Sequence, residues 1–207
     1  MLSLIVEAPW GHYGHPGVAA TLSTVPTYPI APPSTVLGFL EAICCDELGA
    51  LSASGSSMAY GWIKRPSGKG TLLGLNHVRL SDRGVGGRVA VGQRPVHRER
   101  LYNMIYRIVV QGSYAERIPK GLAGELGVDE GAGIYLGISD DVVSRIAEGE
   151  AETEWLVPGH SLWLPTRVPP KEGFASYSNW QRESGAFQFA PPSLDVPAEA
   201  WINNRPT

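Results

Sequence analysis

The stretch from residue 70 to residue 110 constrains the fold of this chain more than any other. Over residues 70–100, apolar and basic side chains alternate on either side of "DRGVGG", where three glycines favour a flexible turn. This pattern predicts a long β-hairpin. The next segment, "RLYNMIYRIVVQGSYAE" at residues 100–116, combines β-branched residues with aromatics and is the strongest strand candidate of the chain. We therefore expect a sheet.

The predicted hairpin also holds most of the positive charge. The 207 residues carry a net charge of −3. Residues 60–107 contain ten Lys and Arg and only two acidic residues, whereas residues 1–59 carry −4 and residues 108–207 carry −7. Positive charge gathered on one element of an acidic body indicates a polyanion-binding element. The structural alternative is a solvated hairpin whose basic residues protect a sheet edge.

A nucleic acid is the first polyanion to consider. If several of these cations neutralise phosphates, binding should fall steeply with salt, by about 0.7 to 0.9 in the log–log slope per phosphate. Four aromatic residues lie among the basic ones and could stack on unpaired bases, although each also suits a core position: Tyr60, Trp62, Tyr102 and Tyr106.

Further elements are short. The sequence predicts a first strand at residues 2–8, a strand at 57–65, a short strand followed by an Asp-capped helix within 133–149, and three short strands within 154–165, 174–180 and 186–192. No repeat, low-complexity run or linker divides the chain, so its length favours one domain.

A helix is predicted after residue 33, and prolines precede it. Pro32 and Pro33 fix the backbone φ and hold the chain extended until one turn, after which Ser34 or Thr35 is a natural N-cap. The apolar residues recur at helical spacing up to a predicted C-cap at Gly49: Val36, Leu37, Phe39, Leu40, Ile43, Cys44 and Leu48. Gly38 would let the helix approach a strand closely, so we expect a helix docked flat on the sheet.

Other chemistries find little support. His12 and His15 have a metal-like spacing but lack two further convincing ligands, so we expect no metal and no cofactor. No Gly-x-Ser-x-Gly and no phosphate-binding loop occurs, and Cys44 and Cys45 lack basic neighbours. A metal-free ribonuclease needs only a Tyr, His or Lys near the scissile phosphate. His77 and His97 lie in the basic segment, where a phosphate or base contact is the simpler role.

The compartment is expected to be the cytoplasm. No apolar run approaches the roughly 18 residues that a membrane span needs, and the N-terminal residues lack the pattern of a signal peptide. The two cysteines are adjacent in a helical pattern and point in different directions, which fits a reducing environment.

Several motifs resemble the fifth CRISPR-associated (Cas) protein family, which belongs to the RAMP superfamily. The proline-rich approach to the first helix matches at Tyr28, Pro29, Pro32, Pro33, Ser34, Thr35 and Gly38, and a second motif matches at Tyr135, Leu136, Gly137 and Ser139. The strand "RERLYNMIYRIVV" lies between them. The resemblance runs from about residue 1 to residue 145.

This resemblance implies an α+β chain with a ferredoxin-like RNA-recognition (RAMP) fold. A basic β-hairpin thumb would be inserted at about residues 63–100 of a domain spanning 1–150, and residues 151–207 would form a small irregular C-terminal extension with short strands. The family's C-terminal glycine-rich loop has no counterpart here. Free backbone N–H groups at the N-terminus of the first helix would suit an RNA phosphate or base edge.

The resemblance also implies a function in antiviral defence. Members of this family bind the 5′ handle of the crRNA in the Cascade ribonucleoprotein complex, cap its backbone filament and contact the large subunit near the PAM-proximal end, for RNA-guided DNA targeting. The implied partners are therefore the crRNA 5′ handle, the backbone and large subunits and, at the PAM, target DNA. RNA contacts are expected from Tyr28, Ser34, Thr35, Lys64, Arg65, Lys69, His77, Arg79, Arg83, Arg88, Arg94, His97 and Arg98.

Two alternatives stay open. A type I-C branch cuts precursor crRNA without a metal, using a Tyr, a Lys and a His. Its Lys-His pair is absent here, and the nearest equivalent is His97 followed by Arg98. An arginine stays protonated and is therefore a poor proton shuttle. We therefore expect no catalytic residue. The other alternative is the equivalent subunit of a type III or type IV effector.

Overall fold

The computed structural model describes residues 1–13, 24–25, 27–80, 90–127, 134–137, 141–158, 187–189 and 196–203. Its centre is a sheet organised around one strand of 22 residues, β5 (Ala90–Gln111). The C-terminal half of β5 lies between β1 (Leu2–Gly11) and β3 (Ser57–Lys64), and both pair with it antiparallel. Its N-terminal half pairs antiparallel with β4 (Gly68–Leu80) and, over two residues, parallel with β2 (Thr24–Val25).

Short strands complete the sheet on both sides. β6 (Arg145–Glu148) pairs with the outer edge of β1, while β7 (Glu154–Pro158) pairs with β3 and with β8 (Phe187–Phe189). The last described segment contains the 3₁₀ turn η1 (Ala198–Ala200) and β9 (Ile202–Asn203), which also pairs with β3. Most ladders are antiparallel and the helices are few, so the α+β class is confirmed.

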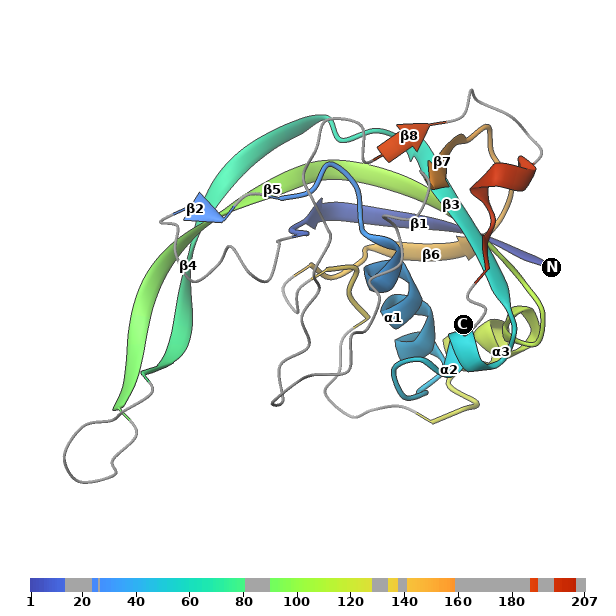
Figure 1. Ribbon diagram of the computed structural model, residues 1–207, viewed down its shortest axis with the longest axis horizontal. Helices are drawn as coiled ribbons and strands as arrows, with labels where there is room; N and C mark the ends of the chain where they lie inside the picture. The colour runs from blue at the N-terminus through green and yellow to red at the C-terminus, as the bar shows by residue number, and fades with distance from the viewer. Residues whose placement is uncertain are drawn as a thin grey trace.

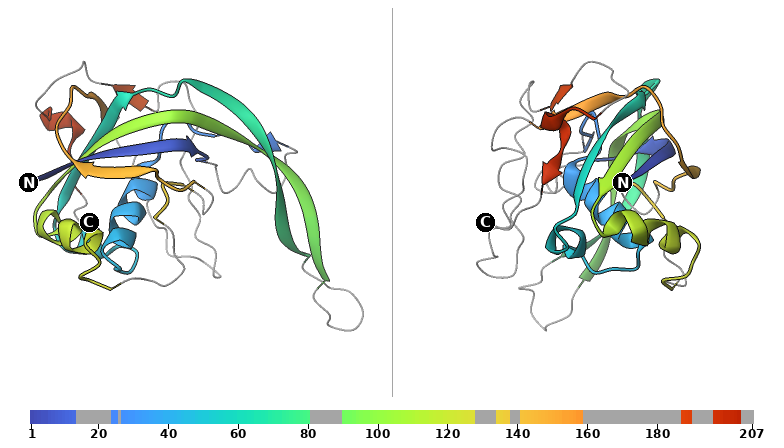
Figure 2. Two further views of the ribbon diagram at one scale, coloured as in Figure 1. Left: turned by 180° about the vertical axis from the view of Figure 1, so that it is seen from behind. Right: turned by 90° about the vertical axis from the view of Figure 1, so that its right-hand side faces the viewer.

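Three helices lie together beneath the arched sheet, at the end remote from the β4–β5 hairpin (Figures 1 and 2). They are α1 (Pro33–Ile43), α2 (Ala50–Ala53) and α3 (Tyr114–Leu122). None of the helices in the described part of the chain is long and apolar enough to cross a membrane.

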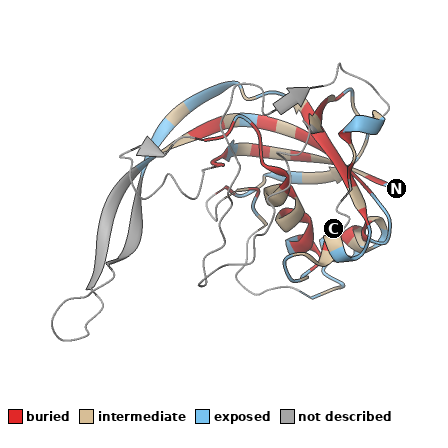
Figure 3. Cartoon of the chain, viewed as in Figure 1, coloured by how far each residue is buried: buried red, intermediate tan, exposed pale blue. Residues whose placement is uncertain are grey.

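The core forms between α1 and one face of the sheet. Alternate residues of β1 are buried, as the period of two in a strand requires, and the apolar stripe of α1 packs against the same cluster (Figure 3). Burying each such side chain contributes about 1.5–3 kcal/mol. The core cluster includes Leu2, Leu4, Val6, Ala8, Val36, Phe39, Leu40 and Ile43.

The predicted helix exists, but its ends differ from the prediction. Pro32 is the N-cap, without a side-chain hydrogen bond, so Ser34 and Thr35 lie inside the first turn. The helix ends at Ile43, and Leu48, predicted in its stripe, is 73% exposed. Buried Glu41 explains this early end, because its carboxylate accepts the N–H groups of Gly49 and Leu51 at 2.9 Å each and so directs the chain into α2.

The predicted close approach of Gly38 to a strand is wrong. A Cβ placed on Gly38 would meet only the Leu48 side chain, at 3.6 Å. The closest helix contact of a glycine is made instead by Gly121 in α3, where a Cβ would lie 2.1 Å from the carbonyl oxygen of Ile43. The close contact between α1 and α3 therefore depends on Gly121 of α3 and not on Gly38 of α1.

Two other predictions about secondary structure are wrong. Residues 145–148, predicted as a short helix, form β6, because the exposed edge of β1 offers them a ladder from Leu4 to Glu7. Residues 114–116, predicted within a strand, begin α3, because Gly112 ends β5 in the left-handed region with φ 99°. Tertiary pairing and one glycine override the local patterns. The predicted strand at 174–180 lies outside the described residues.

Candidate nucleic-acid interface

The predicted basic hairpin is confirmed as an element. β4 and β5 pair without a register shift from Gly68 opposite Tyr102 to Leu80 opposite Ala90, and the ribbon projects beyond the rest of the sheet (Figures 1 and 2). Its predicted turn, with Arg83 and Arg88, lies outside the described residues. Leu72 and Leu73, near the root of this ribbon, are 50% and 57% exposed, so side chains on both of its faces are accessible there.

The pairing register divides the predicted contacts between two faces. Odd-numbered residues pair with odd-numbered residues and even with even, and successive residues of a strand alternate between faces. We call odd residues 69–79 and 91–101 the odd face, and even residues 68–80 and 90–102 the even face. The odd face carries Lys69, His77, Arg79 and His97, and the even face carries Arg94 and Arg98. For His77, Arg79 and Arg94 this placement rests on the backbone alone.

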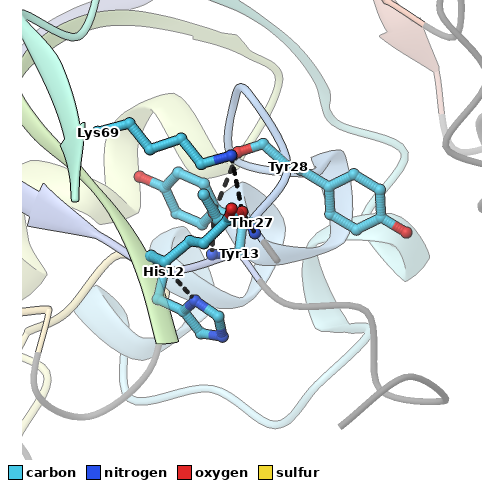
Figure 4. Close-up of polar contacts among 6 residues, drawn as sticks. His12, Tyr13, Thr27, Tyr28 and Lys69 are labelled. Atoms are coloured by element: carbon cyan, nitrogen blue, oxygen red, sulfur yellow. Dashed lines mark hydrogen bonds and ion pairs between the residues drawn. The ribbon is translucent and has the colours of Figure 1, made fainter. Parts of the chain in front are cut away.

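At its root, the odd face is engaged by the chain itself. Lys69 Nζ lies 2.7 Å from Glu99 Oε2, and the same oxygen accepts the N–H of Thr27 at 3.0 Å. Thr27 Oγ1 in turn accepts the N–H of Tyr13 at 2.8 Å. Figure 4 shows these residues gathered beside the root, with the ring of Tyr28 directed away from them. The contacts fasten the segments around Tyr13 and Thr27 to the hairpin.

His12 belongs to the same network as a neutral side chain. Its Nδ1 lies 2.7 Å from the carbonyl oxygen of Glu99, which can only accept, so Nδ1 carries the proton. Burial lowers the pKa of His12, and nearby Arg98 and Arg100 lower it further, whereas the hydrogen bond to Glu99 and the charge of Asp141 raise it.

The predicted metal pair of His12 and His15 is not brought together by any described contact, because His15 lies outside the described residues. Within those residues, no group of three His, Cys, Asp or Glu side chains could hold a metal.

The even face has a different root. Arg100 is 4% exposed, with Nη1 3.6 Å from Oδ1 of fully buried Asp141, which also accepts the N–H of His12 at 2.8 Å. The Arg100 guanidinium lies 5.9 Å from the ring centroid of Trp10, a cation–π distance. Trp10 pairs opposite Tyr102 and is 44% exposed. The root of the even face thus carries the accessible Trp10 indole, and the Arg100 guanidinium beside that ring is held by Asp141.

Tyr102 extends this aromatic surface across the ribbon. A Cβ placed on Gly70 would lie 2.5 Å from Tyr102 Oη and 2.9 Å from its Cε2, so the phenol ring lies directly over Gly70 of β4. Any larger residue at position 70 would displace the ring. Half-buried Arg98 and Leu72, 50% exposed, are the next pair along this face.

The remaining predicted contacts lie elsewhere. Tyr28 is 4% exposed, in the core, and Ser34 and Thr35 are half-buried at the start of α1. The N–H of Thr35 bonds to the carbonyl oxygen of Pro32 at 2.9 Å, so it is not free at the N-terminus of the helix as predicted. Lys64 and Arg65 are exposed at the end of β3, where the Arg65 guanidinium forms two bonds with the Glu154 carboxylate.

The four aromatic residues also separate. Tyr60, Trp62 and Tyr106 are core residues, with Trp62 stacked on Tyr106 at a centroid distance of 4.5 Å, and of the four only Tyr102 is partly exposed.

Cys44 is buried and its pKa is raised to about 11 mainly by desolvation, which leaves the thiol protonated and unreactive.

Sequence reasoning missed Trp10, Glu99, Arg100 and Asp141. Trp10 ends the alternating strand "LIVEAPW", and continued alternation would bury it with Ala8. The alternation of burial breaks beyond Ala8, opposite Asn103, which has a left-handed φ of 54°. The partners of Glu99 and Arg100 come from distant segments, which no local spacing relates to the hairpin.

Comparisons with known proteins give structural neighbours only. No family model matches the chain, and no curated protein matches it. A solved structure described as "CRISPR RNA-guided surveillance complex" aligns with a TM-score of 0.48 and 15% identity, over 68% of this chain and 58% of that chain. Another, described as "Crystal structure of Cas protein", aligns with a TM-score of 0.42 and 16% identity, over 69% and 59%. The chain thus spans less than two thirds of the length of either neighbour.

Proposed function

We propose that this protein is a non-catalytic RNA-binding subunit of a CRISPR effector complex, and that it binds the 5′ handle of the crRNA through the β4–β5 hairpin. The observation that carries the proposal is a projecting ribbon that coincides with the chain's one strongly basic segment. The motifs at residues 28–38 and 135–139 point in the same direction. A ferredoxin-like RAMP architecture, with this ribbon as the thumb, is part of the proposal.

The charge distribution supports RNA rather than protein as the ligand of the ribbon. Arg94 and Arg98 lie four residues apart on the even face, and Lys69, His77 and Arg79 lie on the odd face. Phosphate contacts of this kind position a strand of RNA, while base contacts specify it. The acidic remainder of the chain suits contacts with the backbone subunit and the large subunit, where we place the cap of the filament near the PAM-proximal end.

The test compares two double variants with equal change in charge. Arg94→Ala/Arg98→Ala removes two cations from the ribbon, and Lys120→Ala/Arg145→Ala removes two from elsewhere. We expect the first to weaken binding of a crRNA with its 5′ handle and to lower the salt slope by about 1.4, since each single-strand phosphate contributes about 0.7. The control should keep the wild-type slope. Equal slopes for the two variants, measured by fluorescence anisotropy across a salt series, would contradict the proposal.

A cleavage assay tests the non-catalytic part. His97 is exposed and next to Arg98, so it is the side chain on which the ribonuclease alternative depends. Incubated with a precursor crRNA repeat and EDTA, the wild-type protein should leave the RNA intact. A discrete cut that His97→Ala abolishes would establish the endoribonuclease instead. Co-purification with the other effector subunits tests the partner assignment separately.

A further inference from the structure

The even face carries an exposed aromatic surface that neither the core nor the phosphate contacts explain. Trp10 is 44% exposed at the end of a strand whose other large apolar residues are buried or half-buried. An indole with this exposure forgoes a large part of the hydrophobic stabilisation that full burial would give it. Because Trp10 lies next to the basic ribbon, its exposed ring is placed to contact a ligand that the ribbon binds.

The surface is held in place rather than loosely displayed. Arg100 lies 5.9 Å from the Trp10 ring centroid and is itself fixed by fully buried Asp141. On the neighbouring strands, Tyr102 pairs opposite Trp10 and its ring is seated over Gly70. Two aromatic rings therefore occupy paired positions with fixed supports, which is the arrangement of a stacking platform.

At the described root of the ribbon, the odd face presents different groups. At the same level, the odd face presents the Lys69–Glu99 ion pair, and Glu99 also holds Thr27. A carboxylate repels RNA phosphates, and the contact with Thr27 covers part of this face with the chain itself. Charge and access thus favour the even face, where Arg98, Arg100 and Tyr102 occupy successive positions of β5.

We propose that unpaired nucleobases of a single-stranded RNA stack on Trp10 and Tyr102 of the even face, while Arg98 and Arg94 contact the adjacent phosphates. This inference rests on the proposed RNA-binding function and adds to it the face, the ligand class and the stacking residues. Each base stacked on an aromatic ring contributes about 1–3 kcal/mol, equivalent to about 5- to 150-fold in affinity. The RNA backbone would then follow the ribbon toward its turn.

The experiment separates base stacking from phosphate binding with two probes. One is a labelled oligoadenylate of about 12 nucleotides, within the usual site size of single-strand binders, and the other is an abasic ribose-phosphate oligomer of the same length. The wild-type protein should bind the oligoadenylate at least about 5-fold more tightly. Trp10→Ala should remove most of this preference without changing affinity for the abasic oligomer, and Trp10→Phe should retain part of it.

Controls keep the test independent of folding. Leu72→Ala and Leu73→Ala replace neighbouring exposed side chains on the even and odd faces, which are 50% and 57% exposed. We expect a reduced preference for oligoadenylate only in the even-face variant. Should Trp10→Ala lower the melting temperature, Trp10→Phe still decides, through loss of the tryptophan fluorescence quenching that oligoadenylate causes in the wild type.

The outcomes distinguish this inference from the proposed function. If the wild type binds neither oligomer nor a handle-containing crRNA, the RNA-binding function itself fails. If it binds RNA but Trp10→Ala keeps the full preference for bases, the stacking surface is wrong and the function stands. If that variant instead loses a protein subunit from the assembled complex with RNA binding unchanged, the surface contacts protein, and the inference is overturned.

Discussion

The two halves of β5 contrast more sharply than any two separate elements. From Met104 to Val110 the strand lies between β1 and β3, and every residue except half-buried Ile105 is buried. From His97 to Asn103 the same strand crosses the hairpin root, where exposed, half-buried and buried residues alternate irregularly. One continuous strand thus provides the core in one half and the candidate interface in the other. Substitutions in the two halves should therefore affect different measurements.

The largest effect should come from the boundary between the halves. Arg100→Ala would leave the buried carboxylate of Asp141 without its cation, a loss of about 3–5 kcal/mol in the free energy of unfolding. Lys69→Ala breaks an ion pair that is partly exposed and should change stability by less than about 1 kcal/mol. Urea denaturation measures both. A small effect of Arg100→Ala would mean that the core begins only after residue 100, on the Met104 side of the hairpin root.

A core substitution sharpens the contrast. Ile108→Ala removes a fully buried side chain and should reduce the free energy of unfolding by about 2–5 kcal/mol. Leu73→Ala, on the ribbon and 57% exposed, should stay within about 0.5 kcal/mol of the wild type. The same denaturation series tests them. If Leu73→Ala were as destabilising as Ile108→Ala, the ribbon would be part of the cooperative core, and the division proposed for β5 would be wrong.

A smaller effect should mark His12 at the root. Burial lowers its pKa in the folded state, so the unfolded chain binds more protons once the pH falls below the ordinary value of about 6.5. The stability contributed by neutral His12 is complete above that pH and is lost as the pH falls toward the folded value. Between about pH 7.5 and pH 5.5, the wild type should lose more stability than His12→Gln does.

The control for this pH series is His97→Gln, which replaces an exposed histidine of the ribbon. It should follow the wild-type pH dependence of the melting temperature. A His12→Gln profile that runs parallel to the wild type would mean that His12 keeps an ordinary pKa and that the root is open to water.

Much of the strand content was predictable from local patterns. The alternation in residues 2–8 corresponds to β1, because a strand buried on one face repeats every two residues. The strands predicted at 57–65 and after Arg100 correspond to β3 and the C-terminal half of β5, which are buried on both faces and therefore read as nearly continuous runs. The hairpin followed from alternation around a glycine-rich turn. β6 and α3 were missed because edge pairing and a left-handed glycine decide them, and neither leaves a periodic signal.

The site was predictable in its charge but not in its geometry. The cluster of Lys and Arg identified the ribbon, yet Arg100 and Arg107, counted with it, are buried. Arg107 bonds to Ser3 Oγ and the carbonyl oxygen of Ala151 at 2.9 Å each, from segments far away in the chain. Likewise Trp10, the most exposed aromatic side chain among the described residues, lies in a strand without positive charge. Only the pairing of β1 with β5 brings it to the ribbon.

The sequence by itself determined that this chain forms a strand-rich α+β protein with one strongly basic hairpin, because charge and hydrophobic period are local properties of the residues. The tertiary structure alone decided which cations are buried, which face of the ribbon is engaged by the chain, and that Trp10 stands beside Tyr102. Those features depend on register and on long-range partners such as Asp141, and register is set by the packing of the whole sheet.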